Sequence, residues 1–158
     1  MFKKYGVIII LAGLVLFLLA VFFNRDKMYN FISENMQTQL DERVSAKMKD
    51  ELDKKYNYAQ NKGTFEFTFL EFSSGLCANC KRMEPVMKEI KTSEKVNVNV
   101  VYIQTTKPEN QDIMKYYGIA HIPMQILLDR NGKEFFRNNG FISTDDLESK
   151  FIAYSNHK

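Results

Sequence analysis

The first pattern along the chain is an uninterrupted apolar run near its start. Residues Tyr5 to Phe23 carry no charged side chain. An α-helix needs roughly 20 such residues to cross the hydrocarbon core of a membrane. A cleaved signal peptide is the alternative, but its apolar core is usually only about 7–15 residues long. Leu18 also lies where cleavage after Ala20 would need a small residue. The run therefore predicts an uncleaved transmembrane anchor in residues 1–23.

The charges that flank this run bear on its orientation. Lys3 and Lys4 precede it, and Arg25 and Lys27 follow it, so the basic residues that orient membrane helices are balanced. The free N-terminal amine adds a positive charge to the first side. We therefore expect a single-pass protein of the cell membrane whose N-terminus is inside and whose globular part is extracytoplasmic.

A second pattern fills residues 24–60, where apolar side chains recur at every fourth position from Met28 to Tyr56. No Pro or Gly interrupts the stretch, and helix-forming residues dominate it, so it predicts helix. A four-residue repeat drifts by about 40° per step around a helix of 3.6 residues per turn. We therefore expect a charged helical stalk or linker whose second half docks on the domain. A coiled-coil dimer is an alternative, although a sustained heptad is absent.

The pattern changes again in residues 61–158, where short apolar runs alternate with amphipathic segments, as in a globular domain. The Asn131-Gly132 pair lies between two strand-like runs and is a strong hairpin signal. This order of elements predicts an α/β domain with a parallel pair of strands, an antiparallel hairpin beside it, and helices on both faces. The expected strands are 65–72, 96–104, 124–129 and 134–136, and the expected helices are 76–91, 109–117 and 143 onward.

The charge and the cysteine content of the chain exclude some classes of partner and of fold. The net charge is only +3 and no basic cluster is evident, so a nucleic-acid partner is not expected. The two cysteines, Cys77 and Cys80, lie three positions apart, where a predicted strand gives way to a predicted helix. They cannot join distant segments, which excludes the disulfide framework of a small secreted domain.

The spacing of Cys77 and Cys80 suits reversible thiol chemistry. Two side chains at this spacing lie on the same side of a helical turn and can form a disulfide. The start of a helix favours a thiolate, so Cys77 is the expected nucleophile and Cys80 the residue that resolves the mixed disulfide. A structural disulfide, two inert buried thiols and a zinc site are alternatives. A structural disulfide would remove little chain entropy from so short a ring. Zinc needs four ligands, and only His121 and His157 remain. We expect no metal and no cofactor.

The motifs around the cysteines resemble the thioredoxin family over about residues 44–158. A strand leads into the run Cys-Ala-Asn-Cys-Lys from Cys77, and Pro85 follows the first cysteine by eight residues. A later run, Tyr-Gly-Ile-Ala-His-Ile-Pro, ends at Pro123 and precedes the hairpin and a final helix. The resemblance implies a thioredoxin-like three-layer α/β/α sandwich with a mixed sheet.

The resemblance also implies roles for three further residues. Pro123 would be a cis proline packed against the sulfurs, and the backbone of Ile122 would pair with an extended substrate segment. Glu71, six residues before Cys77, would be a buried acid that exchanges the proton of Cys80. The alternative for Glu71 is a strand residue that faces solvent.

Two departures from the family pattern bear on the direction of electron flow. Leu76 stands where thioredoxin has Trp, and Ala78-Asn79 is neither the Gly-Pro of thioredoxin nor the Pro-His of strong oxidases. We expect a thiol–disulfide oxidoreductase that acts on protein thiols and disulfides, as a reductase of exported proteins supplied by a membrane electron-donor protein. A disulfide-forming oxidase and a membrane accessory protein of the bacteriocin-transport type are the alternatives.

Overall fold

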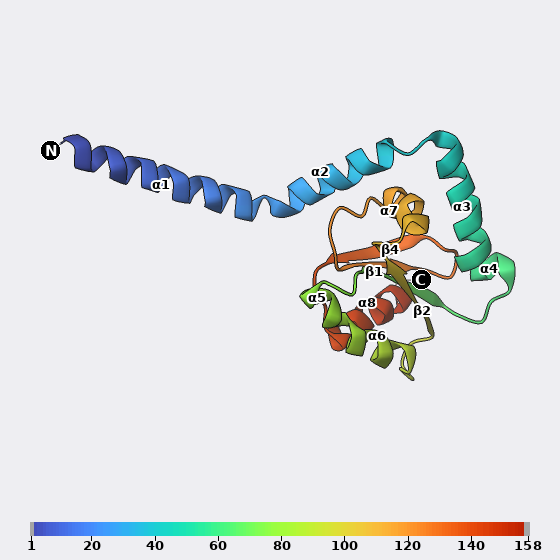
Figure 1. Cartoon of the computed structure of the whole chain (residues 1–158). Helices are drawn as coiled ribbons and strands as arrows, with labels where there is room; N and C mark the ends of the chain where they lie inside the picture. Colours follow the sequence, from blue (N-terminus) through green and yellow to red (C-terminus); the bar gives the residue numbers. More distant parts are fainter. Residues whose placement is uncertain (1, 157–158) are drawn as a thin grey trace.

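A long helical segment at the start of the chain leads into an α/β domain (Figure 1). The computed structural model describes residues 2–156. Its helices are α1 (Phe2–Phe23), α2 (Arg25–Thr38), α3 (Glu42–Tyr56), α4 (Tyr58–Asn61), α5 (Ala78–Lys81), α6 (Met83–Lys91), the 3-10 helix η1 (Pro108–Asn110), α7 (Gln111–Tyr117) and α8 (Thr144–Asn156). Its strands are β1 (Phe67–Ser73), β2 (Val98–Gln104), β3 (Met124–Leu128) and β4 (Glu134–Asn139).

Helix α1 carries the apolar run and extends away from the domain (Figure 1). Its segment Gly6–Phe23 is long and apolar enough to cross a membrane, and the rest of the described chain buries none of it. A signal sequence near an N-terminus can also be this apolar over such a length.

The four strands form one mixed sheet in the order β2-β1-β3-β4. Strand β1 is parallel to β2, β3 is antiparallel to β1, and β4 is antiparallel to β3. The predicted parallel pair with an adjoining hairpin is therefore confirmed. The turn of the hairpin contains Asn131 and Gly132, and the positive φ of Gly132, 74°, explains why glycine occupies this position.

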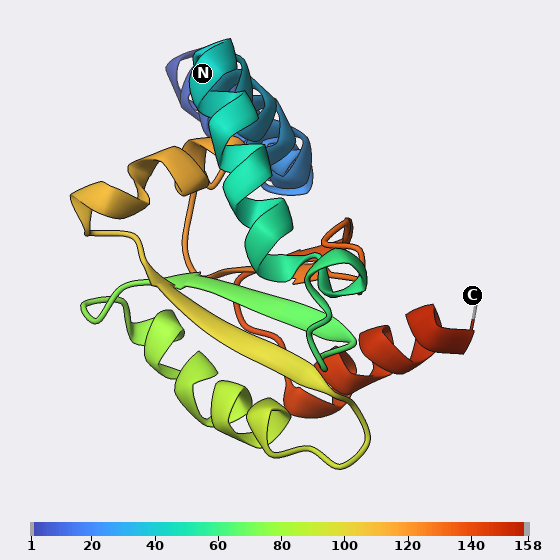
Figure 2. The ribbon, with the colours of Figure 1, turned by 90° about the vertical axis from the view of Figure 1, so that its right-hand side faces the viewer.

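Helices cover both faces of the sheet (Figure 2). Alternate residues of β1 face opposite sides. Phe67 and Phe69 pack in one apolar cluster with α6 and α8, and Leu70 and Phe72 pack in the other with α3 and α7. Glu71 has the parity of the first pair, so its side chain lies on the face that α6 and α8 cover. The three-layer α/β/α prediction is confirmed.

The helix expected at 76–91 is divided into two helices. Helix α5 ends at Lys81 and α6 begins at Met83, with Arg82 between them. Pro85 explains the break, because it has no N–H to donate back to the carbonyl of Lys81 and its ring crowds the preceding turn. The break separates a short segment that carries the cysteines from the longer helix that packs on the sheet.

Helix α2 docks on the domain, although the sequence predicted docking only for the second half of residues 24–60. The ring of Tyr29 stacks on that of His121, with centroids 4.2 Å apart. Ser33 is buried. Arg137 Nη1 donates a hydrogen bond to Ser33 Oγ at 3.4 Å, and Gln37 Nε2 donates one to the carbonyl of Tyr116 at 3.1 Å. These partners come from distant parts of the chain, so the spacing within α2 alone could not reveal them.

Gly118 makes the close approach of α2 possible. It has a φ of 63° after α7, and a Cβ on it would lie 2.5 Å from the backbone oxygen of Ser33. We expect Gly118→Ala to destabilise the protein more than Gly140→Ala does. Gly140 also has a positive φ, but its Cβ would meet no atom of the described chain within 4 Å.

The Gly140→Ala control should lose only about 1–2 kcal/mol of unfolding free energy, the cost of a side chain on a residue with a positive φ. Urea unfolding of the full chain in detergent measures both losses. Equal losses for the two variants would contradict the packing of α2 against Gly118.

Candidate active site

The candidate site lies at one end of the sheet, where β1 ends and β3 begins. Phe72 near the end of β1 pairs with Met124 at the start of β3. The chain leaves β1 through a turn into Cys77 and α5, and Pro123 immediately precedes β3. The sheet therefore brings together the cysteine motif and the proline loop that the sequence singled out separately.

Cys77 and Cys80 hold different positions in the first turn of α5. Cys77 is the N-cap residue, half-buried, and its Sγ accepts a hydrogen bond from the backbone N–H of Cys80 at 3.3 Å. Cys80 is only 2% exposed. One thiol is therefore open to a partner and the other is shielded behind it, and both are free thiols.

The surroundings shift the two thiol pKa values in opposite directions. A hydrogen bond from Cys80 to the Cys77 sulfur lowers the pKa of Cys77, and backbone N–H groups of Cys80 and Asn79 add to this effect. Burial raises the pKa of Cys80, and its interaction with Cys77 raises it further. Because the thiolate is the reactive form, Cys77 is the better nucleophile of the pair.

Alkylation of the reduced full chain should separate the two thiols. At pH 7 we expect iodoacetamide to modify Cys77 at least about tenfold faster than Cys80, because Cys77 is both more accessible and more readily ionised. Mass spectrometry of peptides from the wild type and from Cys80→Ser measures the rates. In urea the two rates should converge. Equal rates in the folded protein would contradict the assignment.

Glu71 is completely buried in β1, so the alternative of a solvent-facing strand residue is wrong. Gln125 Nε2 donates a hydrogen bond to Glu71 Oε2 at 2.9 Å, whereas Glu71 Oε1 has no partner within residues 2–156. Burial raises the pKa of Glu71 to about 8, and the hydrogen bond from Gln125 only partly opposes this shift. Glu71 is therefore mostly protonated at neutral pH.

Two amide residues that the sequence reasoning missed connect Glu71 to the neighbouring strands. Gln125 is fully buried in β3, opposite Glu71 in the strand register. Asn138 Nδ2 in β4 donates to Gln125 Oε1 at 2.7 Å and to the carbonyl of Gly140 at 3.1 Å. A polar Gln within the apolar strand Met124–Leu128 was the available signal, because a buried amide needs hydrogen-bond partners.

The proline loop borders the same end of the sheet. The Ile122–Pro123 peptide is cis. Pro123 is buried, Ile122 is half-buried, and the carbonyl of Pro123 accepts a hydrogen bond from Gly140 N at 2.8 Å. Leu76, directly before Cys77, is 95% exposed and presents an apolar side chain beside this cysteine.

His121 lies in this loop but is turned toward α2. Its ring stacks on Tyr29, and neither ring nitrogen has a hydrogen-bond partner among the described residues. Burial lowers the pKa of His121, so its neutral form is favoured. Within residues 2–156 no group of three or more His, Cys, Asp or Glu side chains is arranged to hold a metal ion.

This arrangement of sheet, cysteine turn and proline loop agrees with the comparisons. A sequence profile of the thioredoxin family matches residues 35–153, more than half of the chain. The chain belongs to the thioredoxin family. The match begins in the last turn of α2, so it includes all of α3 and the sheet but only the end of α2.

Curated relatives and solved structures add to this assignment. Proteins named thiol:disulfide interchange protein DsbD from two strains of Campylobacter jejuni are 31% identical to this thioredoxin-family chain over 85 residues. The alignment covers 51% of this chain but only 15% of those relatives.

Two solved thioredoxins show the fold. A mutant thioredoxin from Halobacterium salinarum superposes with a TM-score of 0.51 at 22% identity, over 59% of this chain and 78% of that one. Thioredoxin-2 of the malaria parasite gives a TM-score of 0.52 at 19% identity, over 58% and 85%. At these identities the likeness establishes the fold alone.

Proposed function

We propose that this thioredoxin-family protein is a thiol–disulfide oxidoreductase whose reactive centre is Cys77 and Cys80. The observation that carries the proposal is the asymmetry of the pair. Cys77 is accessible, with a lowered pKa, and Cys80 is buried, with a raised pKa. Inert structural thiols would need no such difference. The partial likeness to thiol:disulfide interchange proteins supports the same reaction class.

The proposed reaction exchanges one disulfide for another. The Cys77 thiolate attacks one sulfur of a protein disulfide, forms a mixed disulfide and releases the second partner sulfur as a thiolate. Cys80 then loses its proton and attacks the Cys77 sulfur. The products are a Cys77–Cys80 disulfide and a partner that has gained two electrons and two protons as a dithiol. The reverse sequence oxidises the partner.

Glu71 and the proline loop would assist these steps. A carboxyl with a pKa of about 8 can take up or return a proton near neutral pH, and Glu71 lies on the sheet face that α6 covers. We assign it the exchange of the Cys80 proton. The backbone of Ile122, before the cis Pro123, would pair with an extended substrate segment.

We infer further that residues 1–23 anchor the protein in the membrane, that residues 24–60 link the anchor to the domain, and that residues 61–158 form the domain. With the domain outside the cytoplasm, no soluble thiol pool would keep Cys77 and Cys80 reduced. A reductase of exported proteins would therefore take electrons from a membrane protein. Segment Gly6–Phe23 of α1, which is long and apolar enough to cross a membrane, supports this setting.

The reduction potential of the Cys77–Cys80 pair tests the direction of electron flow. We expect the full chain, equilibrated in glutathione or dithiothreitol buffers, to have a potential below that of glutaredoxins, which is about −200 to −230 mV. A value near about −120 mV, that of a strong oxidant, would instead favour disulfide formation. The potential of Leu76→Trp is measured beside that of the wild type, because this variant places the residue of thioredoxin next to Cys77.

Exposed apolar side chains on α2 favour a second candidate, a membrane accessory protein that serves one client. Met28, Phe31 and Ile32 are 49%, 71% and 43% exposed. Trapping with Cys80→Ser in intact cells separates the two candidates, because this variant cannot resolve its mixed disulfides. Many trapped proteins support a general oxidoreductase, and one or none supports the accessory role.

A further inference from the structure

Helix α2 and the connection between α7 and β3 lie side by side and run in opposite chain directions. Two contacts join α2 to this connection and a third joins it to the end of α7, at successive turns of α2. In order along α2 the pairs are Tyr29 with His121, Ser33 with Gly118, and Gln37 with Tyr116. The connection therefore runs back along α2, toward the end of α1, as it approaches Ile122 and Pro123.

The distance from the end of α1 to this loop is short. Tyr29 follows Phe23 by six residues, which is about 9 Å along a helix axis at 1.5 Å per residue. Gln37 follows Phe23 by fourteen residues, or about 21 Å. His121 contacts the nearer of these two positions. The proline loop is thus the part of the α7–β3 connection closest to the apolar segment Gly6–Phe23.

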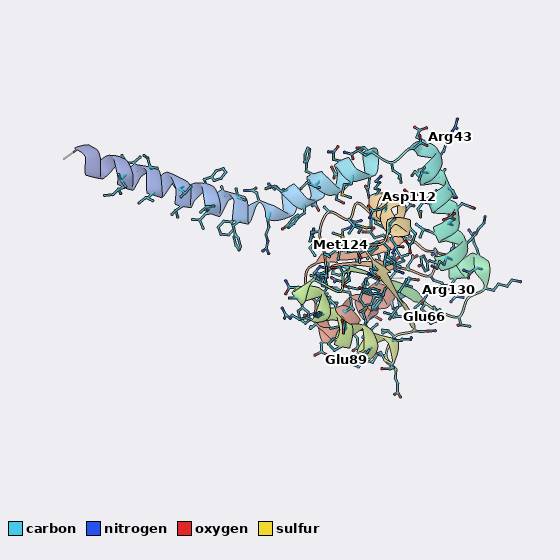
Figure 3. All side chains as sticks on the ribbon, viewed as in Figure 1. Arg43, Glu66, Glu89, Asp112, Met124 and Arg130 are labelled. Carbon is cyan, nitrogen blue, oxygen red and sulfur yellow. The ribbon has the colours of Figure 1, made fainter. Side chains whose placement is uncertain are left out.

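The cysteines share this end of the domain. Phe72 pairs with Met124, so the turn that leads into Cys77 leaves the sheet beside Pro123. In Figure 1, α5 lies on the side of the domain that faces α1. In Figure 3, Met124 lies on that same side, whereas Glu66 and Arg130 lie toward the opposite end of the sheet.

We propose that docked α2 turns the face formed by Leu76, Cys77, Ile122 and Pro123 toward the bilayer, and that its exchange partner is a disulfide or dithiol of an integral-membrane protein close to the membrane surface. This inference rests on the proposed anchor and on the proposed exchange reaction. A soluble exported protein would reach the end of the domain that faces away from the bilayer more easily than this face. The inference therefore narrows the exchange partner to integral-membrane proteins. Leu76 gives such a partner an exposed apolar contact next to the nucleophile.

The orientation can be measured without any redox reaction. In the full chain, Cys80→Ser leaves Cys77 as the sole thiol, which is labelled with bimane. The protein is reconstituted into phosphatidylcholine liposomes that contain lipid with a nitroxide on its headgroup. The control places the same label at exposed Glu94→Cys, between α6 and β2, in a Cys77→Ser/Cys80→Ser background. We expect severalfold stronger quenching at Cys77 than at position 94.

Each outcome bears on a different statement. Failure of the protein to float with liposomes would overturn the anchor and this inference with it. Flotation with equal quenching at both positions would overturn the orientation alone and leave the reaction intact. Tyr29→Ala/Gln37→Ala removes two of the three contacts and should reduce the difference between the positions. A difference unchanged in this variant would overturn the role of docking.

The partner class has its own test. Full-length Cys80→Ser is expressed in intact cells, thiols are blocked with N-ethylmaleimide, and the mixed disulfides are separated into membrane and soluble fractions. We expect the trapped partners to be integral-membrane proteins, and fewer of them with Tyr29→Ala/Gln37→Ala added. Trapped partners that are all soluble would overturn the inference even if Cys77 faces the bilayer.

Discussion

Cys77→Ser should reduce the turnover of a disulfide substrate by about a thousandfold or more, the scale of losing a nucleophile. A serine hydroxyl does not ionise near neutral pH and cannot form a disulfide. Cys80 cannot take its place, because it is only 2% exposed and burial raises its pKa. Reduction of a fluorescent peptide disulfide by the full chain, with dithiothreitol as electron source, measures the loss.

Cys80→Ser is the matched control for this result. It keeps the attack by Cys77 but blocks resolution, so it should accumulate one mixed disulfide per chain and turn over slowly. Mass spectrometry under non-reducing conditions detects that species. If Cys77→Ser trapped the substrate and Cys80→Ser did not, the roles of the two cysteines would be reversed.

Glu71→Gln should remove a large part of the pH dependence of stability. The pKa of Glu71 rises from 4.5 to about 8 on folding, so between these values the folded chain holds a proton that the unfolded chain has released. Stability therefore falls as pH rises through this window and levels off above about pH 8. The shift corresponds to on the order of 4–5 kcal/mol over the whole window.

Urea unfolding of the reduced full chain at several pH values between 5 and 9 gives the slope of the unfolding free energy against pH. Glu71→Gln, which is neutral at every pH, should be the more stable protein at the alkaline end. Exposed Glu66, directly before β1, provides the control, because Glu66→Gln should leave the slope unchanged. A slope that persists in Glu71→Gln would assign the ionisation to another group.

Much of the sheet was predictable from local patterns. The apolar runs that became β1 and β2 are rich in strand-forming residues, and Asn131-Gly132 marks the turn between β3 and β4. Pro85 marked where the helix after Cys77 is disturbed, but it could not place the break at Arg82, because a proline near the start of a helix can be tolerated or can interrupt it.

The docking of α2 could not be predicted in the same way. It depends on Arg137, which lies 104 positions after Ser33 and donates hydrogen bonds to Ser33 Oγ and to the carbonyl of Tyr117. The polar side chains of α2 read as a solvated surface until the fold brings these partners together. Gly118 directly follows the helix expected at 109–117, and its close approach to Ser33 of α2 becomes visible only in the tertiary structure.

The candidate site shows the same division. Cys77, Cys80 and Pro123 were found from two short motifs, each of which is formed by residues close together in the sequence. Gln125 was missed because its importance comes from the strand register that places it opposite Glu71. Asn138 requires one more register, that between β3 and β4, before its contact with Gln125 can be anticipated.

The docked α2 also sets how the domain can move. Asn24 is the one residue between α1 and α2, and α2 is fastened to the domain at three successive turns. Rotation about Asn24 would therefore carry the whole domain as a rigid body on a short radius. With α1 in a membrane, as we propose, a group held in this way stays in a thin layer at the membrane surface, to which its neighbours in the same membrane are also confined. Encounters would then depend on lateral diffusion in two dimensions, so even a scarce membrane partner could be met often.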